Sequence, residues 1–400
     1  MKFVLVGTAY PLRGGIAQFN ATLVRTLRAR GHEVHVLTFS RQYPNLLFPG
    51  KSQKEEGPAP EGLDVGAEIV IDTINPWTWW RAARRIREIK PDVVFYKYWM
   101  PFFAPCFGTI SRWVRGSGAR IVYICDNIIP HERRLLDHSL TRYLVGSGDA
   151  FIVMTRSVED DLRSFRADAP AALVPHPVYE HFGRPLPREE ALRRLAERGI
   201  ELAGEDRPLI LFFGIIRPYK GLDILLRAMP RIIKETGAGL IVGGEFYAGR
   251  KETFELVSEL GLQKDVFLVD GYVPNEDVGL YVSASRVVVL PYRSATQSGI
   301  VQVAFQLECP VIATDVGGLG EMIRHGETGF LVPPEDPAAV ADAVCRYLQE
   351  GLETPMRNAV RSEKSRFTWA RMAAAVEDLG RGVRPEAVTA DRGEGNDSKI

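Results

Sequence analysis

The chain has 400 residues, 46% of them hydrophobic and 25% charged, and its 50 basic residues equal its 50 acidic residues in number. That length exceeds one ordinary domain and fits two of about 150–200 residues each. A net charge of zero gives no reason to expect nucleic acid as a partner. The four cysteines form no CxxC pair and are not grouped with histidines, so we expect free thiols in a reducing cytoplasm and no metal site.

Apolar runs typical of strands alternate with helical patterns along the N-terminal half. The first run, in MKFVLVGTAY, favours a β-strand over a signal peptide. No run reaches the ~18 apolar residues of a membrane span, so we expect a soluble cytoplasmic protein. Runs that are apolar at consecutive positions are typical of parallel strands buried on both faces. The expected strands of this half are 3–6, 33–39, 67–72, 91–96, 120–125 and 150–154.

The alternation restarts after a proline-rich stretch at 175–190, where we place the domain junction. We therefore predict an α/β protein with two doubly wound, Rossmann-like domains. Composition predicts a long loop at 40–66 and a disordered tail at 382–400. Ligands of such sheets bind at the carboxyl ends of the strands, so the expected site is the cleft between the domains. The expected strands of the second half are 208–214, 239–244, 266–271, 286–291, 309–314 and 329–334.

Two glycine-containing loops are candidates for binding an anion. In GTAYPLRGGIAQFN, Gly14 and Gly15 open a predicted helix whose free N–H groups favour an anion, although ordinary turn chemistry is an alternative. In FFGIIRPYKGLD, Gly214 turns the chain, and Arg217 and Lys220 follow it at the end of a strand. A guanidinium and an ammonium so placed suit a diphosphate, and two solvated surface cations are the alternative reading.

A third loop, RSATQSGIVQVA at 293–304, contains hydroxyls, amides and a glycine but no acid and no histidine. A serine or threonine there caps the next helix, and the N–H groups of Ser298, Gly299 and Ile300 are then able to face a ligand. A carboxylate in this position would repel a diphosphate. The loop therefore indicates an anion site that needs no acidic side chain.

Asp126 and His131 follow the predicted strand 120–125. Side chains of these types beyond a strand's carboxyl end are candidates for a base or for orienting a substrate. For His131, a loop histidine with no chemical role is the alternative.

Together these loops resemble the family 4 glycosyltransferases, which have the GT-B fold. The motifs that carry the resemblance are GGIAQFN, FFGIIRPYKGLDILLRAM, GYVPNEDVGLYVSASRVVVLPY and CPVIATDVGGLGEMIRHGETGFLVPPED, and it spans residues 2–380. It implies that domain 179–366 binds a nucleotide-diphosphate sugar. Domain 1–178, completed by a final helix at 367–380, would bind a glycan or lipid-linked acceptor. The implied reaction is sugar transfer with retention of anomeric configuration, without a metal or other cofactor.

The resemblance also assigns roles to single residues. Arg217 and Lys220 match the family's donor-phosphate pair, and Gly14 and Gly15 match its glycine loop near the diphosphate. Asp126 and His131 fall in the region that supplies the acceptor-side histidine or aspartate, and both stay open.

Two further positions match the family's nucleoside pocket. Glu245 lies at the strand end where the nucleoside often sits. The backbone at Tyr272 and Val273 matches the segment that usually contacts the base.

One departure from the family lies in the third loop. The family commonly has two glutamates eight positions apart there, and Ala295 and Val303 stand at those positions. Gln297 and Gln302 are the nearest polar substitutes. An amide can donate as well as accept and adds no negative charge beside two phosphates, so we expect Gln297 and Gln302 to hold the donor.

Two other functions remain as alternatives. A non-catalytic protein that binds nucleotide sugars would have lost activity along with the two glutamates. A nucleotide-sugar epimerase would need several carboxylates, and the loop at 293–303 contains none.

The segment WTWWRAARRIREIK at 77–90 combines three tryptophans with five cations in a predicted helix. Trp79 and Trp80 would insert into a membrane surface while the cations meet anionic lipid. The alternative is a tryptophan face packed in the core beside a solvated basic face. Peripheral contact with the cytoplasmic membrane face is therefore left open.

Overall fold

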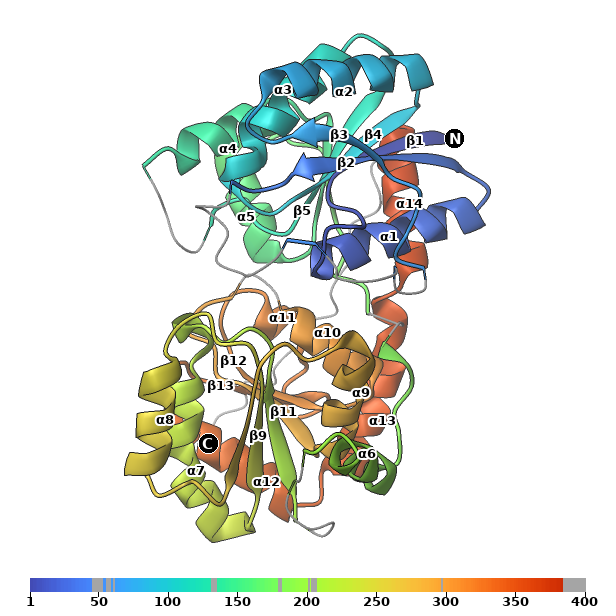
Figure 1. Cartoon of the computed structure of the whole chain (residues 1–400). Helices are drawn as coiled ribbons and strands as arrows, with labels where there is room; N and C mark the ends of the chain where they lie inside the picture. The colour runs from blue at the N-terminus through green and yellow to red at the C-terminus, as the bar shows by residue number, and fades with distance from the viewer. Residues whose placement is uncertain are drawn as a thin grey trace, which may run out of the picture.

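The computed structural model describes residues 1–44, 53–54, 59, 62–130, 135–178, 182–200, 202, 207–295 and 298–383. These residues form two lobes, each built on one sheet (Figure 1). Parts of the predicted loop at 40–66, and nearly all of the predicted tail at 382–400, lie outside the described residues.

The N-terminal lobe contains a seven-stranded sheet in the order β3-β2-β1-β4-β5-β6-β7, in which every pairing is parallel. All the strands predicted for this half are present. β7 was not predicted, because it has only three residues and buries only the middle one. The strands are β1 (Lys2–Val6), β2 (Glu33–Arg41), β3 (Glu68–Asp72), β4 (Val93–Tyr98), β5 (Arg120–Cys125), β6 (Ala150–Val153) and β7 (Ala171–Leu173).

The C-terminal lobe contains a six-stranded sheet in the order β10-β9-β8-β11-β12-β13, also parallel throughout. The strands predicted for this half are all present. They are β8 (Leu209–Phe213), β9 (Gly239–Gly244), β10 (Val266–Asp270), β11 (Val287–Leu290), β12 (Val311–Thr314) and β13 (Gly329–Val332).

Helices cover both faces of each sheet, as expected for doubly wound domains. The helices of the first lobe are α1 (Gly15–Ala29), α2 (Pro76–Ile89), α3 (Ala104–Val114), α4 (Asp137–Val145) and α5 (Arg156–Phe165), with the 3₁₀ turn η2 (Pro101–Phe103). Those that follow are α6 (Arg188–Ala196), α7 (Leu222–Thr236), α8 (Arg250–Glu259), α9 (Asn275–Ala284), α10 (Gly299–Gln306), α11 (Leu319–Met322), α12 (Pro337–Gln349), α13 (Glu353–Glu363) and α14 (Trp369–Gly380), with the 3₁₀ turns η4 (Pro218–Lys220) and η5 (Lys364–Arg366).

The consecutive apolar runs reflect burial on two sides. In β1, Phe3 and Leu5 belong to one hydrophobic cluster, and Val4 and Val6 belong to the cluster on the opposite face. Neighbouring side chains of a strand point to opposite faces, so a strand covered on both faces is apolar at every position. β8 follows the same rule with a separate cluster on the outer face of the second lobe.

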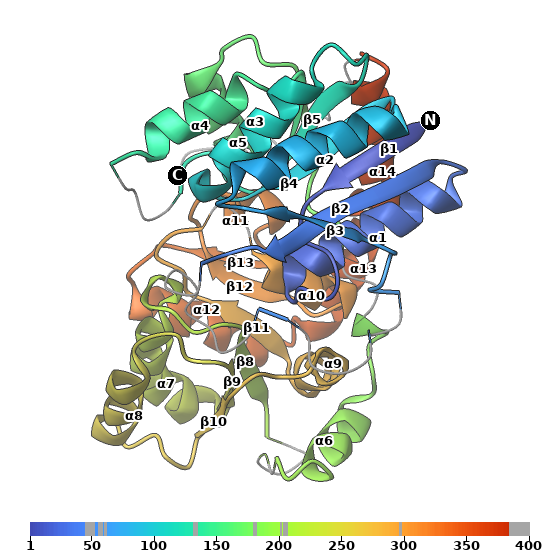
Figure 2. The same ribbon diagram turned by 45° about the horizontal axis from the view of Figure 1, so that its top comes forward.

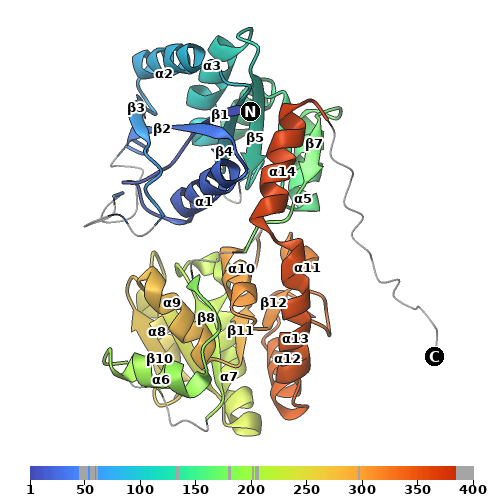
Figure 3. The same ribbon diagram turned by 90° about the vertical axis from the view of Figure 1, so that its right-hand side faces the viewer.

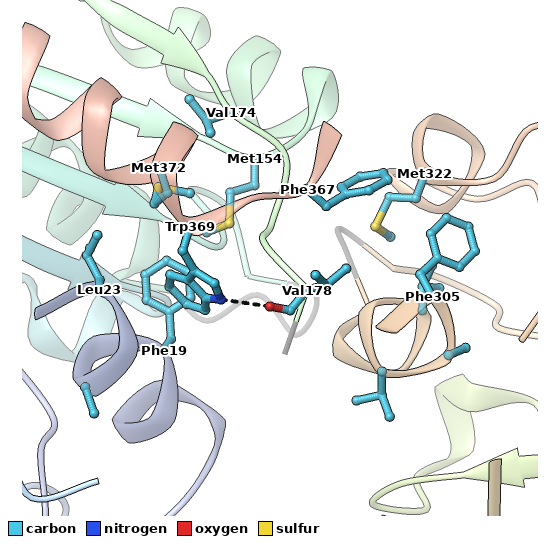
Figure 4. Packing of buried hydrophobic residues seen from close by; sticks show 14 of the residues in the cluster. Phe19, Leu23, Met154, Val174, Val178, Phe305, Met322, Phe367, Trp369 and Met372 are labelled. Atoms are coloured by element: carbon cyan, nitrogen blue, oxygen red, sulfur yellow. Dashed lines mark hydrogen bonds between the residues drawn. The ribbon is translucent and has the colours of Figure 1, made fainter. Parts of the chain in front are cut away.

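The last helix, α14, returns to the first lobe and packs against α1 (Figure 3). Trp369 Nε1 donates a hydrogen bond to the carbonyl oxygen of Val178 (2.8 Å), and the Trp369 ring meets Phe19 edge to face (Figure 4). The Val178 N–H donates to the carbonyl oxygen of Phe367 (3.0 Å). The chain passes between the lobes after Val178 and again before Trp369, and these two segments are therefore hydrogen-bonded to each other.

A second contact between the lobes is made by Glu321 in α11. Its carboxylate accepts hydrogen bonds from the backbone N–H groups of Arg156 (2.8 Å) and Ser157 (3.4 Å), at the start of α5. Views from different directions place α10 and α11 on the side of the second lobe that faces the first (Figures 1 and 2).

Candidate functional site

Each sheet reverses its strand order at one place, between β1 and β4 in the first lobe and between β8 and β11 in the second. The loops on either side of such a point diverge and leave a crevice at the carboxyl ends of the strands, which is where open α/β sheets bind ligands. The residues predicted from sequence lie mainly in the loops after these four strands.

The loop after β8 brings three predicted residues together. Gly214 has a φ of 103°, which favours glycine. A β-carbon at this position would lie 3.1 Å from Lys220 Nζ and 3.2 Å from Ile300 Cδ1, so Lys220 and the first turn of α10 both adjoin Gly214. Any larger residue here would occupy the space between the ammonium and the start of the helix.

Lys220 is buried, with 9% of its surface exposed. Burial is the main cause that lowers the pKa of its ammonium to about 8; Tyr219 opposes this shift, and the positive charge of Arg217 adds to it. Within the described parts of the chain, the structure shows neither an ion pair nor a hydrogen bond for this ammonium. A buried cation without a protein partner is costly, and an anionic ligand would relieve that cost.

Arg217 lies at the start of the same turn and faces two hollows. Its guanidinium carbon lies 5.2 Å from the centre of the Tyr247 ring. It lines a cavity of about 610 Å³ between the lobes and another of about 660 Å³ beside α7 and α8. Arg217 is thus placed to meet an anion at the edge of the cleft.

Helices α1 and α10 both present uncapped N-termini. Gly14, the residue before α1, has a φ of 107° and is exposed, as is Gly15, and no side chain of the described residues caps the helix. At α10 the N-cap residue is Ser298, as expected, and among the described residues its side chain makes no capping bond. That the backbone N–H groups of Ser298, Gly299 and Ile300 face a ligand stays a prediction.

The two lobes approach each other at the glycine loop. The guanidinium carbon of Arg13 lies 5.8 Å from the centre of the Tyr272 ring, which is 58% exposed. Val273, next to it, has its side chain buried. The structure thus places the loop containing Gly14 opposite the segment predicted to contact a base.

Glu245 lies beside the turn that carries Arg217. Its carbonyl oxygen accepts a hydrogen bond from the N–H of Ile216 (2.9 Å), and Gly244 approaches Gly214 so closely that a β-carbon there would lie 2.2 Å from the carbonyl oxygen of Gly214. Glu245, the predicted nucleoside contact, therefore follows β9, and the predicted phosphate contacts Arg217 and Lys220 follow the neighbouring strand β8.

Asp126 is paired with a lysine that sequence reasoning missed. Lys97 in β4 is 1% exposed, and its Nζ donates to Asp126 Oδ1 at 2.5 Å. The ammonium lies 3.6 Å from the centre of the Phe19 ring. Burial lowers the pKa of Lys97, and the negative charge of Asp126 opposes that shift. Asp126 is thus held in one place at the carboxyl end of β5.

His176 is a second residue that was missed. It is buried, its Nδ1 lies 2.8 Å from the carbonyl oxygen of Pro177, and its ring meets Phe19 edge to face. Burial, reinforced by the charge of Lys97, lowers its pKa to about 4, so the imidazole is neutral near pH 7. The only sign of it in the sequence was a histidine in the predicted linker. His131, which was predicted, lies outside the described residues.

The two glutamines have different outcomes. Gln297 lies outside the described residues. Gln302 is fully buried in α10, where its Nε2 donates to the sulfur of Met322 (3.2 Å) and its Oε1 has no partner among the residues described. Ala295 and Val303, at the positions of the family's glutamates, are also buried. Contact between Gln302 and a donor stays a prediction, and the structure leaves no surface of this side chain exposed.

The cavity between the lobes is largely apolar on the side of the first lobe. Met100, Phe102 and Leu140 line it there, and Asn127 and Asp137 are the polar groups on that side. Arg217, Tyr219 and Ser294 line it from the second lobe. Arg217, the predicted phosphate contact, thus also faces the apolar side of this cavity.

The helix with three tryptophans is α2, and its orientation corrects one expectation. Trp79 is partly buried against the core, with Nε1 donating to the carbonyl oxygen of Asp72 (2.8 Å), so it does not face outward. Trp77 and Trp80 are exposed instead, at 77% and 49%. No helix in the described part of the chain is long and apolar enough to cross a membrane.

Two family models match the chain: the one described as Glycosyltransferase Family 4 over residues 13–182, and the one described as Glycosyl transferases group 1 over 207–350. A D-inositol 3-phosphate glycosyltransferase from Acidothermus cellulolyticus is 30% identical over 408 aligned residues, which cover 94% of this chain and 87% of the relative. The chain belongs to the family 4 glycosyltransferases.

Solved structures share the fold of this family 4 glycosyltransferase. HepE from Anabaena in complex with UDP has a TM-score of 0.74 at 16% identity, covering 96% of this chain and 100% of that one. Sucrose-phosphate synthase from Thermosynechococcus elongatus has a TM-score of 0.72 at 20% identity, covering 96% and 99%. The GT-B fold predicted for the chain is thereby confirmed.

Proposed function

We propose that this glycosyltransferase moves a sugar from a nucleoside-diphosphate donor to a hydroxyl of a glycan or lipid-linked acceptor, with retention of configuration. The observation that carries the proposal is Lys220, a buried ammonium without a partner among the described residues, beside Gly214 and the uncapped start of α10. These groups favour a compact ligand with several negative charges, such as a diphosphate. The solved structures of HepE with UDP and with UDP-glucose support the same ligand class.

In the proposed reaction the bond between the anomeric carbon and the diphosphate oxygen breaks, and a bond to the acceptor oxygen forms. The acceptor proton passes to the departing diphosphate, so no other reactant is needed. Negative charge grows on the diphosphate as the bond breaks, and Arg217, Lys220 and the helix N-termini stabilise it. The stretch 293–303 contains no acid, so no carboxylate of that loop acts as a nucleophile.

Asp126 is proposed to orient the acceptor hydroxyl. It lies at the end of β5, and its neighbour Asn127 lines the cavity between the lobes. Its bond to Lys97 fixes one carboxylate oxygen. A carboxylate held in this way at a strand end is suited to orient a hydroxyl group of the acceptor. Retention itself rests on the family and is tested by the anomeric configuration of the product.

The proposal is tested with a thermal-shift screen of UDP-, GDP- and ADP-sugars, followed by donor consumption with candidate acceptors. We expect one nucleotide class to raise Tm and NMR of the product to show the donor's anomeric configuration. Failure of all three classes to bind contradicts the proposal. Tight binding without turnover on any acceptor would favour a non-catalytic nucleotide-sugar-binding protein.

We further propose that the first lobe touches an anionic membrane surface through α2. Trp77 and Trp80 are exposed on this helix, and the exposed cations Arg81, Arg84 and Arg87 follow them. Tryptophan rings insert at a lipid interface while cations meet anionic headgroups.

The test is co-sedimentation with phosphatidylcholine vesicles that contain 0% or about 30% phosphatidylserine, an anionic lipid. We expect binding only with the anionic lipid, and at least a fivefold loss in a Trp77→Ala/Trp80→Ala double variant. Trp113→Ala, which alters an exposed tryptophan of α3, is the matched control. Equal sedimentation with both vesicle types contradicts the contact.

A further inference from the structure

Arg293 lies in the loop after β11, which leads towards the start of α10. Its side chain is about two-thirds buried and reaches back to the turn that carries Arg217 and Lys220. Sequence reasoning assigned it no role.

The contacts of Arg293 join the two loops at several points. Its backbone N–H donates to the carbonyl oxygen of Tyr219 (2.7 Å), and Nη1 donates to the carbonyl oxygen of Pro218 (2.7 Å). Both acceptors belong to η4, the turn that ends at Lys220. The backbone of this turn is therefore held from the adjacent strand's loop.

Two carboxylates hold the guanidinium itself. Nη1 and Nη2 donate to the two oxygens of Asp223 (2.9 and 2.8 Å), and Nε donates to Glu335 (2.6 Å). These bonds hold the pKa of Asp223 below its usual range and raise that of Arg293. Four of the five guanidinium N–H groups are thus used within the protein.

The same two loops also meet through their backbones. Gly221 has a φ of 66°, and a β-carbon there would lie 2.0 Å from the carbonyl oxygen of Pro291. The rings of Tyr219 and Tyr292 meet edge to face, with Lys220 Nζ 5.5 Å from the centre of the Tyr292 ring. The position of Lys220 therefore depends on how this loop is fixed against the turn.

We infer that Arg293 is a positioning residue for the donor diphosphate, because it fixes the Arg217–Lys220 turn at a set distance from the N-terminus of α10. It acts through the turn, since its own N–H groups are committed to Asp223, Glu335 and Pro218. A planar guanidinium makes these bonds in one plane, and a lysine ammonium cannot reproduce them. This inference rests on the proposed function, and it adds the residue that sets the geometry of the phosphate site.

The test measures the Kd of UDP, GDP or ADP, whichever binds the wild-type protein most tightly, together with kcat, KM and Tm. We expect Arg293→Ala to raise Kd at least tenfold and Arg293→Lys to give an intermediate increase. Asp223→Asn should act in the same direction with a smaller effect. In the wild-type protein, nucleotide binding should weaken above about pH 8, because the pKa of Lys220 is lowered to about 8 by burial. Arg293→Ala should expose Lys220 to more water and raise this pKa, so the pH midpoint of binding should move upward.

The matched control is Arg231, which lies further along α7. Its guanidinium also pairs with two carboxylates, Glu235 of α7 (2.7 Å) and Asp342 of α12 (2.6 Å). Arg231→Ala should leave Kd and its pH midpoint unchanged. If Arg293→Ala and Arg293→Lys bind the nucleotide as wild type does, with the same pH midpoint, the inference is wrong while the proposed function stands. If the wild-type protein binds none of the three nucleotides, the proposed function itself fails.

Discussion

Lys97 and Lys220 are two buried lysines, each beside the crevice of its own lobe, and their surroundings differ. Lys97 is bonded to Asp126 at 2.5 Å and covered by the Phe19 ring. Lys220 has no carboxylate within ion-pair distance among the residues the structure describes. The first lobe neutralises its buried cation with its own carboxylate, whereas the described residues of the second lobe place no carboxylate beside Lys220. The proposed anion site therefore belongs to the second lobe.

The largest effect is expected for Lys97→Met. Removal of the ammonium leaves the mostly buried carboxylate of Asp126 without its cation, so the free energy of unfolding should fall by about 3–5 kcal/mol. Urea unfolding followed by circular dichroism measures the change. The double variant Lys97→Met/Asp126→Asn should recover much of the loss, because no charge is then left unpaired. Equal losses in the single and double variants would show that the pair is not coupled.

The second effect concerns Lys220→Met. Loss of the ammonium should reduce kcat/KM at least tenfold, equivalent to about 1.4 kcal/mol of transition-state stabilisation. In the absence of nucleotide, the variant should be as stable as wild type or more so, since a desolvated cation is replaced by an apolar side chain of similar length. Steady-state kinetics and thermal unfolding measure the two properties. A destabilised Lys220→Met protein would remove the contrast with Lys97.

The smallest effect is a pH dependence. The pKa of Lys220 is lowered to about 8 in the free protein, so the ammonium that binds the diphosphate loses its proton above that pH. The affinity for the best nucleotide should be about fourfold lower at pH 8.5 than at pH 7. Calorimetric titration at both pH values gives the ratio. Lys220→Arg, which stays charged, should show no decrease over this range, and a decrease of the same size would assign the titration to another group.

The strands were predictable because burial on both faces leaves a continuous apolar run, as in β1 and β8. The phosphate turn was predictable because Gly214, Arg217 and Lys220 are local in sequence. The pairing of Lys97 with Asp126 was not, because it depends on two strands meeting side by side, 29 positions apart. Arg293 was missed for the same reason, since Pro218 and Asp223 lie 75 and 70 positions earlier and Glu335 lies 42 positions later.

The orientation of α2 could be read from the sequence, and the expectation that Trp79 faces outward was wrong. Trp79 shares a helix face with Ala82, Ala83 and Ile86, which are spaced three, four and seven positions later and are buried. That spacing places Trp79 inward and leaves Trp77 and Trp80 outward. The spacing of each tryptophan from the buried alanines and isoleucine predicts which tryptophans face solvent, whereas the number of tryptophans does not.

The bond between the Val178 N–H and the Phe367 carbonyl has a practical consequence for dividing the molecule. An isolated first lobe that ended at residue 178 would lack α14 and expose the face of α1 that this helix covers. Residues 178 and 367 are hydrogen-bonded neighbours, so a short peptide linker could join them. The resulting chain would contain the first lobe followed directly by α14. We expect the first lobe with α14 to fold as a fragment without the second lobe, so that ligand binding by this lobe can be measured alone.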